Sequence, residues 1–383
     1  MALIREHSLS RRSLLQAAIA TAGTTALGVG LAACGGSSGS NKSKKIGTTP
    51  DEIAALAKKE GKLQLIAYPK TWANYGGSFK AFTAKYGIPI SVANPDGSSA
   101  QELTALKTLK GQSSEPDVVD IGYEFTQQAI SQKLIAQYKP ANWAAVPTHL
   151  KDPDGWWTAA YYGVISIGAD TKKVPAPTTM KDLLKPIYKG KVSLGGDPRT
   201  ATDSFAAVFA AAIANGGSAD NVQPGIDFFA ELVKNGNFVK ATSNDSALST
   251  GQAAVVIDWN FNLLGFKPDL KKSGVDLAYS VPTDAVFGNY YAQPVAADCP
   301  QPNAGRLWVD WLTSDEGSEQ YALGGAVPAR FEELVKAGSL SAKALASLPD
   351  PTTLKQITFP TAAQAAAAQK LVMAQWGSKV LNA

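Results

Sequence analysis

The sequence predicts an α/β fold with open, mostly parallel sheets, in which a second α/β unit begins near residue 164. Strand and helix patterns alternate along the chain, and this alternation is typical of parallel sheets. The 383 residues include a predicted leader of 33, so the remaining 350 are enough for two domains or one large one. Open sheets of this kind bind ligands at the carboxyl ends of their strands, so we expect the functional groups in the loops that follow strands.

The first unit opens with a helix whose start is marked by Thr49, Pro50 and Glu52, which are an N-cap, a first-position proline and a capping-box glutamate. Gly61 ends this helix. Strands are expected over 63–67, 88–92 and 117–121, with helices around 79–82 and over 101–109. The loop after each of these strands is polar or aromatic, which makes all three loops candidates for the binding site.

An aromatic segment over 140–163 interrupts the alternation, and at least one of Trp157, Tyr161 and Tyr162 is expected in the core. The second unit then begins with a strand over 164–167. It continues with a strand over 192–194, a polar loop, a helix over 205–213 and an apolar strand over 253–257. That last strand ends in Asp258, so a carboxylate emerges from a buried run.

The first 34 residues have the features of an export leader. Residues 10–15 read Ser-Arg-Arg-Ser-Leu-Leu, a twin-arginine pattern, and a mild apolar run follows and ends in Leu-Ala-Ala-Cys at 31–34. That ending resembles the lipobox of bacterial lipoproteins, which implies removal of residues 1–33 and a lipid on Cys34. Residues 34–48 then form a flexible tether. A membrane-spanning anchor helix is the alternative, but glycines and threonines make the run weakly hydrophobic.

Charge and cysteine content exclude two classes of protein. The net charge of +4 includes three arginines of the leader, and no basic stripe remains that would bind nucleic acid. Of the two cysteines, Cys34 is assigned to lipidation, so Cys299 has no partner and no disulfide framework forms within the chain. This cysteine content agrees with twin-arginine export, which by the motif's resemblance carries proteins already folded in the cytoplasm.

The whole mature chain resembles the extracellular solute-binding proteins of bacterial ABC importers, in the type II class with two α/β lobes joined by two crossing segments. The resemblance rests on residues 65–72, 98–109, 116–122, 161–168 and 304–317, in this order along the chain. It implies a first lobe of residues 49–163 and 288–383, a second lobe of residues 164–287, and a ligand in the cleft between them.

The resemblance also implies how such a protein works. Hinge closure buries a small solute between the lobes, and the closed form is recognised by the ABC permease. We therefore expect a monomeric binding protein with no enzyme activity, cofactor or metal. It would be exported by the twin-arginine route and held by the lipid on Cys34 at the outer face of the cell membrane, or lie in the periplasm.

Twelve residues are predicted to bind the ligand, and they lie in the loops after strands or on the second crossing. They are Tyr68, Trp72, Ser98, Ser99, Tyr123, Arg199, Thr200, Thr202, Asp258, Trp259, Tyr290 and Tyr291. The aromatic rings would stack on a ligand, or pack on neighbouring helices and at the hinge. The two serines would offer hydroxyl and amide groups, and they would equally serve as ordinary N-cap residues.

The charged members of this set point to opposite kinds of ligand. Arg199, with the threonines beside it, suits a carboxylate or phosphate, and its alternative is a surface arginine beside a capping box. Asp258 must meet either a protein cation or a cationic ligand, because an unpaired buried carboxylate is costly. An amine, a zwitterion or an amine-bearing phosphonate would satisfy these groups.

Within the family, the nearest resemblance is to the branch that binds ferric iron, polyamines, thiamine and phosphonate-type solutes. Ferric binders place adjacent tyrosines after the second-lobe strand, where this chain has Asp258, Trp259 and Asn260. An organic solute, of the polyamine type, is therefore preferred to a ferric site, which stays the alternative within the family.

An exported hydrolase is the competing class. The sequence has no nucleophile elbow, zinc-protease motif or phosphate-binding loop, and His149 is the only histidine after the leader. A glycosidase that uses two carboxylates, and a lipoprotein adaptor that binds protein, remain alternatives.

Overall fold

The computed structural model describes residues 45–382. The predicted leader, Cys34 and most of the predicted tether lie outside the described residues. Within the described part, no helix is both long and apolar enough to cross a membrane.

The described residues form eleven strands and fourteen α-helices, joined by short 3-10 turns. The strands are β1 (Leu63–Ile66), β2 (Ile90–Ala93), β3 (Ile121–Gly122), β4 (Ile135–Ala136), β5 (Ala159–Asp170), β6 (Val192–Leu194), β7 (Val255–Trp259), β8 (Leu277–Ser280), β9 (Gly288–Ala292), β10 (Val295–Ala296) and β11 (Val327–Pro328). The helices are α1 (Pro50–Glu60), α2 (Tyr75–Tyr86), α3 (Ser99–Thr108), α4 (Thr126–Ser131), α5 (Thr202–Ala214), α6 (Gln223–Lys234), α7 (Asn244–Thr250), α8 (Asn260–Lys272), α9 (Pro302–Leu312), α10 (Asp315–Leu323), α11 (Phe331–Ala337), α12 (Ala342–Ser347), α13 (Pro351–Lys355) and α14 (Ala362–Trp376).

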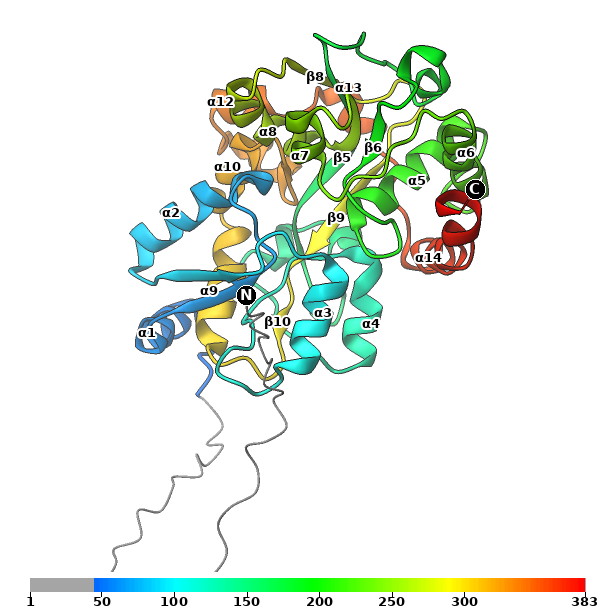
Figure 1. Cartoon of the computed structure of the whole chain (residues 1–383). Coiled ribbons are helices and arrows are strands. Elements are labelled where there is room, and N and C mark those ends of the chain that lie inside the picture. Colours follow the sequence, from blue (N-terminus) through cyan, green and yellow to red (C-terminus); the bar gives the residue numbers. More distant parts are fainter. Residues whose placement is uncertain (1–44, 383) are drawn as a thin grey trace, which may run out of the picture. The chain divides into compact units, whose positions relative to one another are not determined.

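A small sheet organises the N-terminal part of the described chain. β1 and β2 pair in parallel, and β10 pairs with β4 in antiparallel fashion. Val118 bridges both β1 and β10, so these two pairs form one continuous surface. Helices α1 and α9 pack together beside this sheet (Figure 1), and the ring of Phe82 on α2 meets that of Trp308 on α9 at 5.1 Å.

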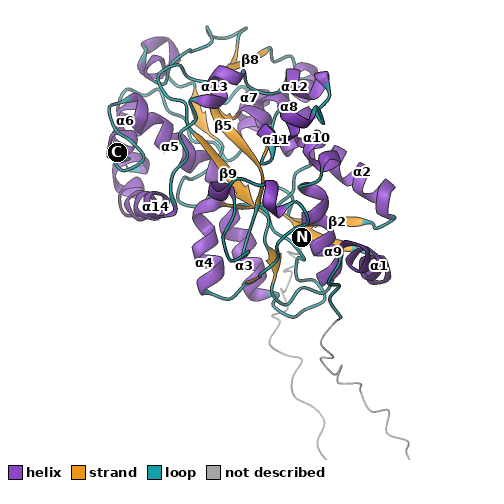
Figure 2. Ribbon diagram, turned by 180° about the vertical axis from the view of Figure 1, so that it is seen from behind, coloured by secondary structure: helices purple, strands orange, loops and turns teal. Residues whose placement is uncertain are grey.

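A larger sheet has the strand order β3-β9-β5-β7-β6, with β8 and β11 also paired to β5. The first half of β5 pairs with β9, and its second half pairs with β7 and β8. We call the part with β1, β2, β4 and β10 the first half of the structure and the part with β6, β7 and β8 the second half. β5 and β9 form one antiparallel ribbon between these halves, and Figure 2 shows the two strands side by side.

The predicted α/β class is confirmed, but the expectation of mostly parallel sheets was wrong. Among the described residues, six of the eight strand pairings are antiparallel. The reason is the long strand β5, because β7, β8, β9 and β11 all run opposite to it. The alternation of strand and helix in the sequence does not reveal these pairings between distant segments.

The C-terminal segment lies against both halves of the structure. Thr358 bridges Phe287 just before β9, and α14 then packs against α6 and against the turn Tyr123–Phe125 (Figure 1). Trp376 on α14 meets Phe229 on α6 with ring centroids 5.3 Å apart. The lobe boundaries expected at 163/164 and 287/288 remain a prediction, and this last segment is not confined to the first lobe's elements.

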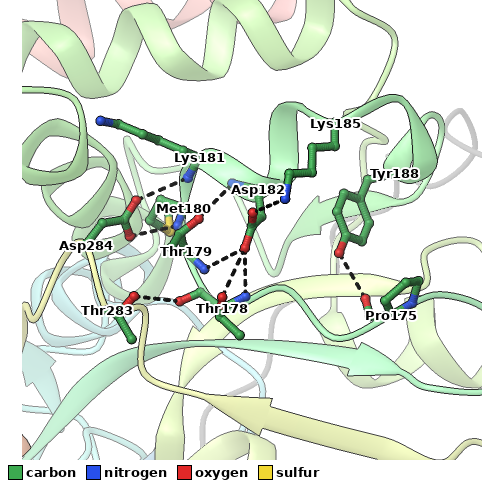
Figure 3. A network of polar contacts seen from close by, with 10 residues as sticks. All are labelled: Pro175, Thr178, Thr179, Met180, Lys181, Asp182, Lys185, Tyr188, Thr283 and Asp284. Carbon is green, nitrogen blue, oxygen red and sulfur yellow. Dashed lines mark hydrogen bonds and ion pairs between the residues drawn. The ribbon is translucent and has the colours of Figure 1, made fainter.

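A polar network fixes the long loop between β5 and β6 (Figure 3). Asp182 accepts the backbone N–H groups of Thr178 and Thr179 at 3.0 and 3.1 Å, and the ammonium of Lys185 beside it lowers its pKa. Asp284, in the loop before β9, accepts the backbone N–H of Met180 at 2.9 Å. Asp182 thus braces the loop from within, and Asp284 ties it to the segment before β9.

Candidate functional site

The candidate site is a cavity of about 600 Å³, within the range of small-molecule pockets. Its wall is built from the loop after β1, the start of α3 and the segment before β3 on one side. On the other side it is built from the loop between β6 and α5, the segment 238–245, the end of β7 and the first turn of α8. The cavity therefore lies at strand ends, as the sequence predicts, and both halves of the structure contribute to it.

Seven of the twelve predicted residues line this cavity: Trp72, Ser98, Ser99, Thr200, Thr202, Asp258 and Tyr291. Ser98 is also the N-cap of α3 and forms a capping box with Gln101. The Ser99 hydroxyl accepts the backbone N–H of Gly122 at 3.0 Å, which ties the start of α3 to β3. The structural and wall-lining roles of these serines are thus compatible.

Three predicted aromatic residues lie outside the wall because their rings are used in the core. Tyr68 is fully buried, and its hydroxyl donates to Gln293 Oε1 at 2.6 Å. The rings of Tyr123 and Tyr290 pack against each other with centroids 4.6 Å apart. In the structure these three rings pack in the core, and none of them lines the cavity.

Trp259 also lies outside the wall, although it adjoins Asp258. Because side chains alternate between the two faces of a strand, the Trp259 ring points away from the side chain before it. Its indole N–H donates to the hydroxyl of Tyr291 at 3.1 Å, so it supports a residue of the wall from behind.

Arg199 is engaged by a protein carboxylate instead of facing the cavity. Its Nη2 lies 2.6 Å from Asp197 Oδ2, and its Nε donates to both oxygens of the same carboxylate at 2.9 and 3.1 Å. These hydrogen bonds use the edge of the guanidinium, with its Nε and Nη2 donors, that an anionic ligand would need. Asp197, and not Arg199, lines the cavity.

The wall is strongly acidic. Seven carboxylic residues line it, against one cationic residue, Lys240; they are Asp96, Glu102, Asp120, Asp197, Asp203, Asp245 and Asp258. Within the described chain, Asp197 is the only one of the seven that forms an ion pair with a protein cation. The wall therefore holds more carboxyl groups than the cations of the described chain neutralise.

Asp258 is a buried carboxyl group of the wall, with 2% of its surface exposed. It accepts the amide N–H of Asn244 and of Asn262 at 2.8 Å each, and the backbone N–H of Trp259 at 2.7 Å. Its pKa is raised to about 7, first by burial and then by the neighbouring carboxylate of Asp203, against the effect of these hydrogen bonds.

Asp120 and Glu102 are buried carboxyl groups on the opposite side of the wall. Asp120 is 3% exposed and accepts the hydroxyls of Tyr75 and Tyr161 at 2.9 Å each. Its backbone N–H donates to Glu102 Oε1 at 2.7 Å. Burial raises the pKa of Asp120 to about 7 and that of Glu102 well above its usual range, and in Glu102 the nearby Asp120 adds to this effect.

Several wall residues were missed by the sequence-based prediction. Asp203 lies in the polar stretch that follows β6, so a search of the loops after strands would have found it. Asp120 lies in an apolar run directly before β3, where no polar loop marks it. Glu102 falls within an amphipathic helix pattern. Trp376 and Leu381 of the C-terminal segment carry no local signal, because only the fold brings them to the cavity.

The two halves of the structure touch beside the cavity. The Thr202 hydroxyl at the start of α5 donates to Glu124 Oε1 at 2.6 Å, and burial raises the pKa of Glu124 to about 7. A Cβ placed on Gly122 would overlap the Thr202 side chain. A Cβ on Gly265 of α8 would lie 2.6 Å from the carbonyl oxygen of Thr71. Only glycine at these two positions allows the backbone to come so close to Thr202 and Thr71. The structure therefore shows the two walls of the cavity in contact with each other.

The tyrosine pair and His149, which bear on a metal site, are each engaged in contacts with other side chains of the described residues. Among residues 45–382, no group of three His, Cys, Asp or Glu side chains is arranged to hold a metal ion. The rings of Tyr290 and Tyr291 do not converge, because the first packs on Tyr123 and the second accepts a hydrogen bond from Trp259. His149 packs against Phe359 and is not part of the cavity wall.

Comparison with protein families gives one match, to bacterial extracellular solute-binding proteins, over residues 113–363. A search of curated protein sequences finds no match to this chain.

Several solved structures share the fold at low sequence identity. One is the periplasmic binding protein AfuA from Actinobacillus pleuropneumoniae, with fructose-6-phosphate bound, at a TM-score of 0.67 and 18% identity over 84% of this chain and 99% of that one. Another is AgtB from A. tumefaciens R10 in complex with agropinic acid, at 0.64 and 13%, over 84% and 99%. A third is the spermidine/putrescine-binding protein PotD from Streptococcus pneumoniae, at 0.59 and 16%, over 83% and 99%. All three are binding proteins, and their two-lobed fold is the fold of this chain.

Proposed function

The chain belongs to the bacterial extracellular solute-binding proteins, and from this premise we propose that its cavity captures a small organic amine for an ABC importer. Proteins of this family are exported binding proteins rather than enzymes, and their partners are a small solute and an ABC permease. That the solute is an amine goes beyond the family assignment, and the acidic wall of the cavity is the observation that supports it.

Charge balance favours a cation. Seven carboxylic residues and one lysine line the wall, and one of the seven is neutralised by Arg199. Like charges gathered in a partly enclosed cleft produce a potential that concentrates oppositely charged solutes. A protonated amine enters such a cavity with favourable electrostatic energy, whereas a phosphate or carboxylate enters against it.

Burial sharpens this preference. Asp258 and Asp120 are almost fully buried, and their carboxylates accept neutral donors without a protein cation at salt-bridge distance. An ionised carboxylate without a counter-ion in such a place is costly. An ammonium group placed between the two walls would act as this counter-ion, and its interaction with both would favour the closed state.

The solutes named for the similar structures differ in charge, so these structures do not indicate whether the ligand of this chain is a cation or an anion. AfuA holds a sugar phosphate, and PotD is named for polyamines. Arg199, the predicted anion-binding group, is held by Asp197 through Nε and Nη2, which leaves Lys240 as the one cationic residue among the described residues of the wall. The wall of this chain therefore agrees better with the amine than with the phosphate.

We also propose that the protein leaves the cytoplasm by the twin-arginine route and remains attached to the membrane by a lipid on Cys34. A tether of the predicted length would leave the cavity free to open and close beside a permease. A single copy of the chain contains the whole cavity wall, which supports a monomer.

The proposal is tested by a thermal-shift screen of residues 34–383 carrying Cys34→Ser. The screen compares 1,4-diaminobutane, spermidine, 4-phenylbutylamine and n-butylamine with fructose-6-phosphate and 4-aminobutyrate. A ligand that binds the native state raises the melting temperature in proportion to the logarithm of its concentration over its Kd. Stabilisation by at least one amine and none by the phosphate is expected, and the reverse order would refute the amine.

A further inference from the structure

One end of the cavity is apolar and is built from three segments that are distant in the sequence. Leu194 ends β6, Phe238 follows α6, and Trp376 and Leu381 come from the C-terminal segment; all four line the wall. Phe229 on α6 packs against both Phe238 and Trp376, with ring centroids 6.2 and 5.3 Å apart, so these side chains share one cluster.

The strand register fixes this cluster relative to the buried carboxyl group. β6 pairs in parallel with β7, so Leu194 lies opposite Ile257 and Asp258 follows directly. On the other side of β6, Val192 bridges Phe238. Phe238 is level with Val192, three residues short of the level of Asp258, and two strand spacings separate them laterally, so their backbone positions are about 14 Å apart.

The charge at this end is also different from the charge near Asp258. Lys240, the only cationic residue of the wall, follows Phe238 by two residues, and Asp197 is neutralised by Arg199. An ammonium group at this end would therefore meet a like charge, while an apolar group would meet aliphatic and aromatic side chains.

The C-terminal segment contacts α6 and the loop before it through polar side chains as well as through Trp376. Lys379 forms an ion pair with Asp227 of α6 at 3.2 Å, and Gln364 at the start of α14 donates to Asp220 at 2.8 Å. The family match ends at residue 363, just after α14 begins. Leu381 and Trp376 are thus contributed by a part of the chain that the family pattern does not include.

From these observations we propose that the C-terminal segment completes an apolar subsite, and that the preferred ligand is a monoamine with an apolar tail instead of a diamine. This inference rests on the proposed amine-binding function. The ammonium group lies among the buried carboxyl groups, and the tail extends past β6 toward Phe238 and Leu381. An aromatic ring on a short methylene chain spans this separation.

The experiment measures Kd by calorimetry for 4-phenylbutylamine, n-butylamine and 1,4-diaminobutane on residues 34–383 with Cys34→Ser. We expect 4-phenylbutylamine to bind at least tenfold more tightly than either of the others. Phe238→Ala and Leu381→Ala should reduce this preference to within about threefold, while n-butylamine binding changes little. Met373→Ala is the matched control, because Met373 lies on α14 but is exposed and outside the wall.

The outcomes separate the two proposals. If 1,4-diaminobutane binds more tightly than 4-phenylbutylamine, the amine function stands and the apolar subsite is refuted. If the preference survives both alanine variants, or is lost equally in Met373→Ala, the assignment to these side chains is also refuted. If no amine binds, the proposed function fails and the subsite fails with it. Because Leu381 lies at the end of the chain, its variant tests the subsite even if Phe238→Ala fails to fold.

Discussion

Replacing Asp258 by asparagine should stabilise the ligand-free protein and weaken ligand binding. The carboxyl group is 2% exposed, and burial raises its pKa from 3.8 to about 7. A rise of this size corresponds to about 4 kcal/mol of unfavourable free energy in the ionised form. The variant places an amide N–H against Asn244, which forfeits a hydrogen bond worth about 1–2 kcal/mol. The net gain is then about 2–3 kcal/mol, or roughly 5 °C in Tm.

The pH dependence follows from the sign of the pKa change. Because the folded pKa is above the unfolded value, the native state of the natural protein binds more protons, and Asp258 lowers stability as pH rises from about 4 through 7. The variant lacks this loss. Its advantage should therefore be small near pH 4, grow through pH 7, and be complete at about pH 8.

Urea unfolding of both proteins between pH 5 and 8.5 measures this difference, and titration with an amine at pH 8 measures binding. Asp245→Asn is the matched control, because it removes a carboxylate of the same wall from an exposed position, and it should change stability by less than about 0.5 kcal/mol. For Asp258→Asn we expect Kd to rise at least tenfold. A variant that is less stable at pH 8, or whose advantage is equal at pH 5 and pH 8, would refute the reasoning.

Three further predictions concern closure, charge and anchoring. Gly122→Ala should weaken amine binding at least tenfold, because its Cβ would overlap the Thr202 side chain and hold the two walls apart. Binding should recover when Thr202→Ala is added. A normal Kd in the single variant would contradict the proposed contact between the walls. Arg199→Ala should leave the Kd for an amine within about threefold, since its partner is Asp197; a loss above tenfold would show that the arginine serves the ligand. Cys34→Ser should abolish labelling by radioactive palmitate and release the protein from the membrane fraction, and persistent labelling would rule out this anchor.

Local structure and the position of the cavity could be read from the sequence, because they depend on signals within a few residues. Thr49 caps α1 as its sequence predicts. The apolar run before Asp258 forms β7, and the carboxyl group emerges into the cavity. The polar loop after β6 also reaches the wall.

The rest depends on contacts between distant segments. Tyr68 follows a strand as a ligand-stacking aromatic would, yet its hydroxyl is taken by Gln293, more than two hundred residues away in the chain. Arg199 is different, because its partner Asp197 stands only two residues before it, yet the sequence does not show that the guanidinium turns to this carboxylate and not to a ligand. The antiparallel pairing of β5 with β9 brings such segments together, and no periodicity in the sequence records it.

The central claim is that buried carboxyl groups without protein counter-ions form the site for a cation. Titration of 1,4-diaminobutane and of 4-phenylbutylamine at pH 7, in two buffers of different ionisation enthalpy, measures the protons exchanged on binding. Asp120 and Asp258 have pKa values raised to about 7 by burial, so they are partly protonated at this pH, and an ammonium group would lower both. We predict release of about half a proton or more per ligand bound. Proton uptake, binding without proton exchange, or no binding of either amine would contradict the account.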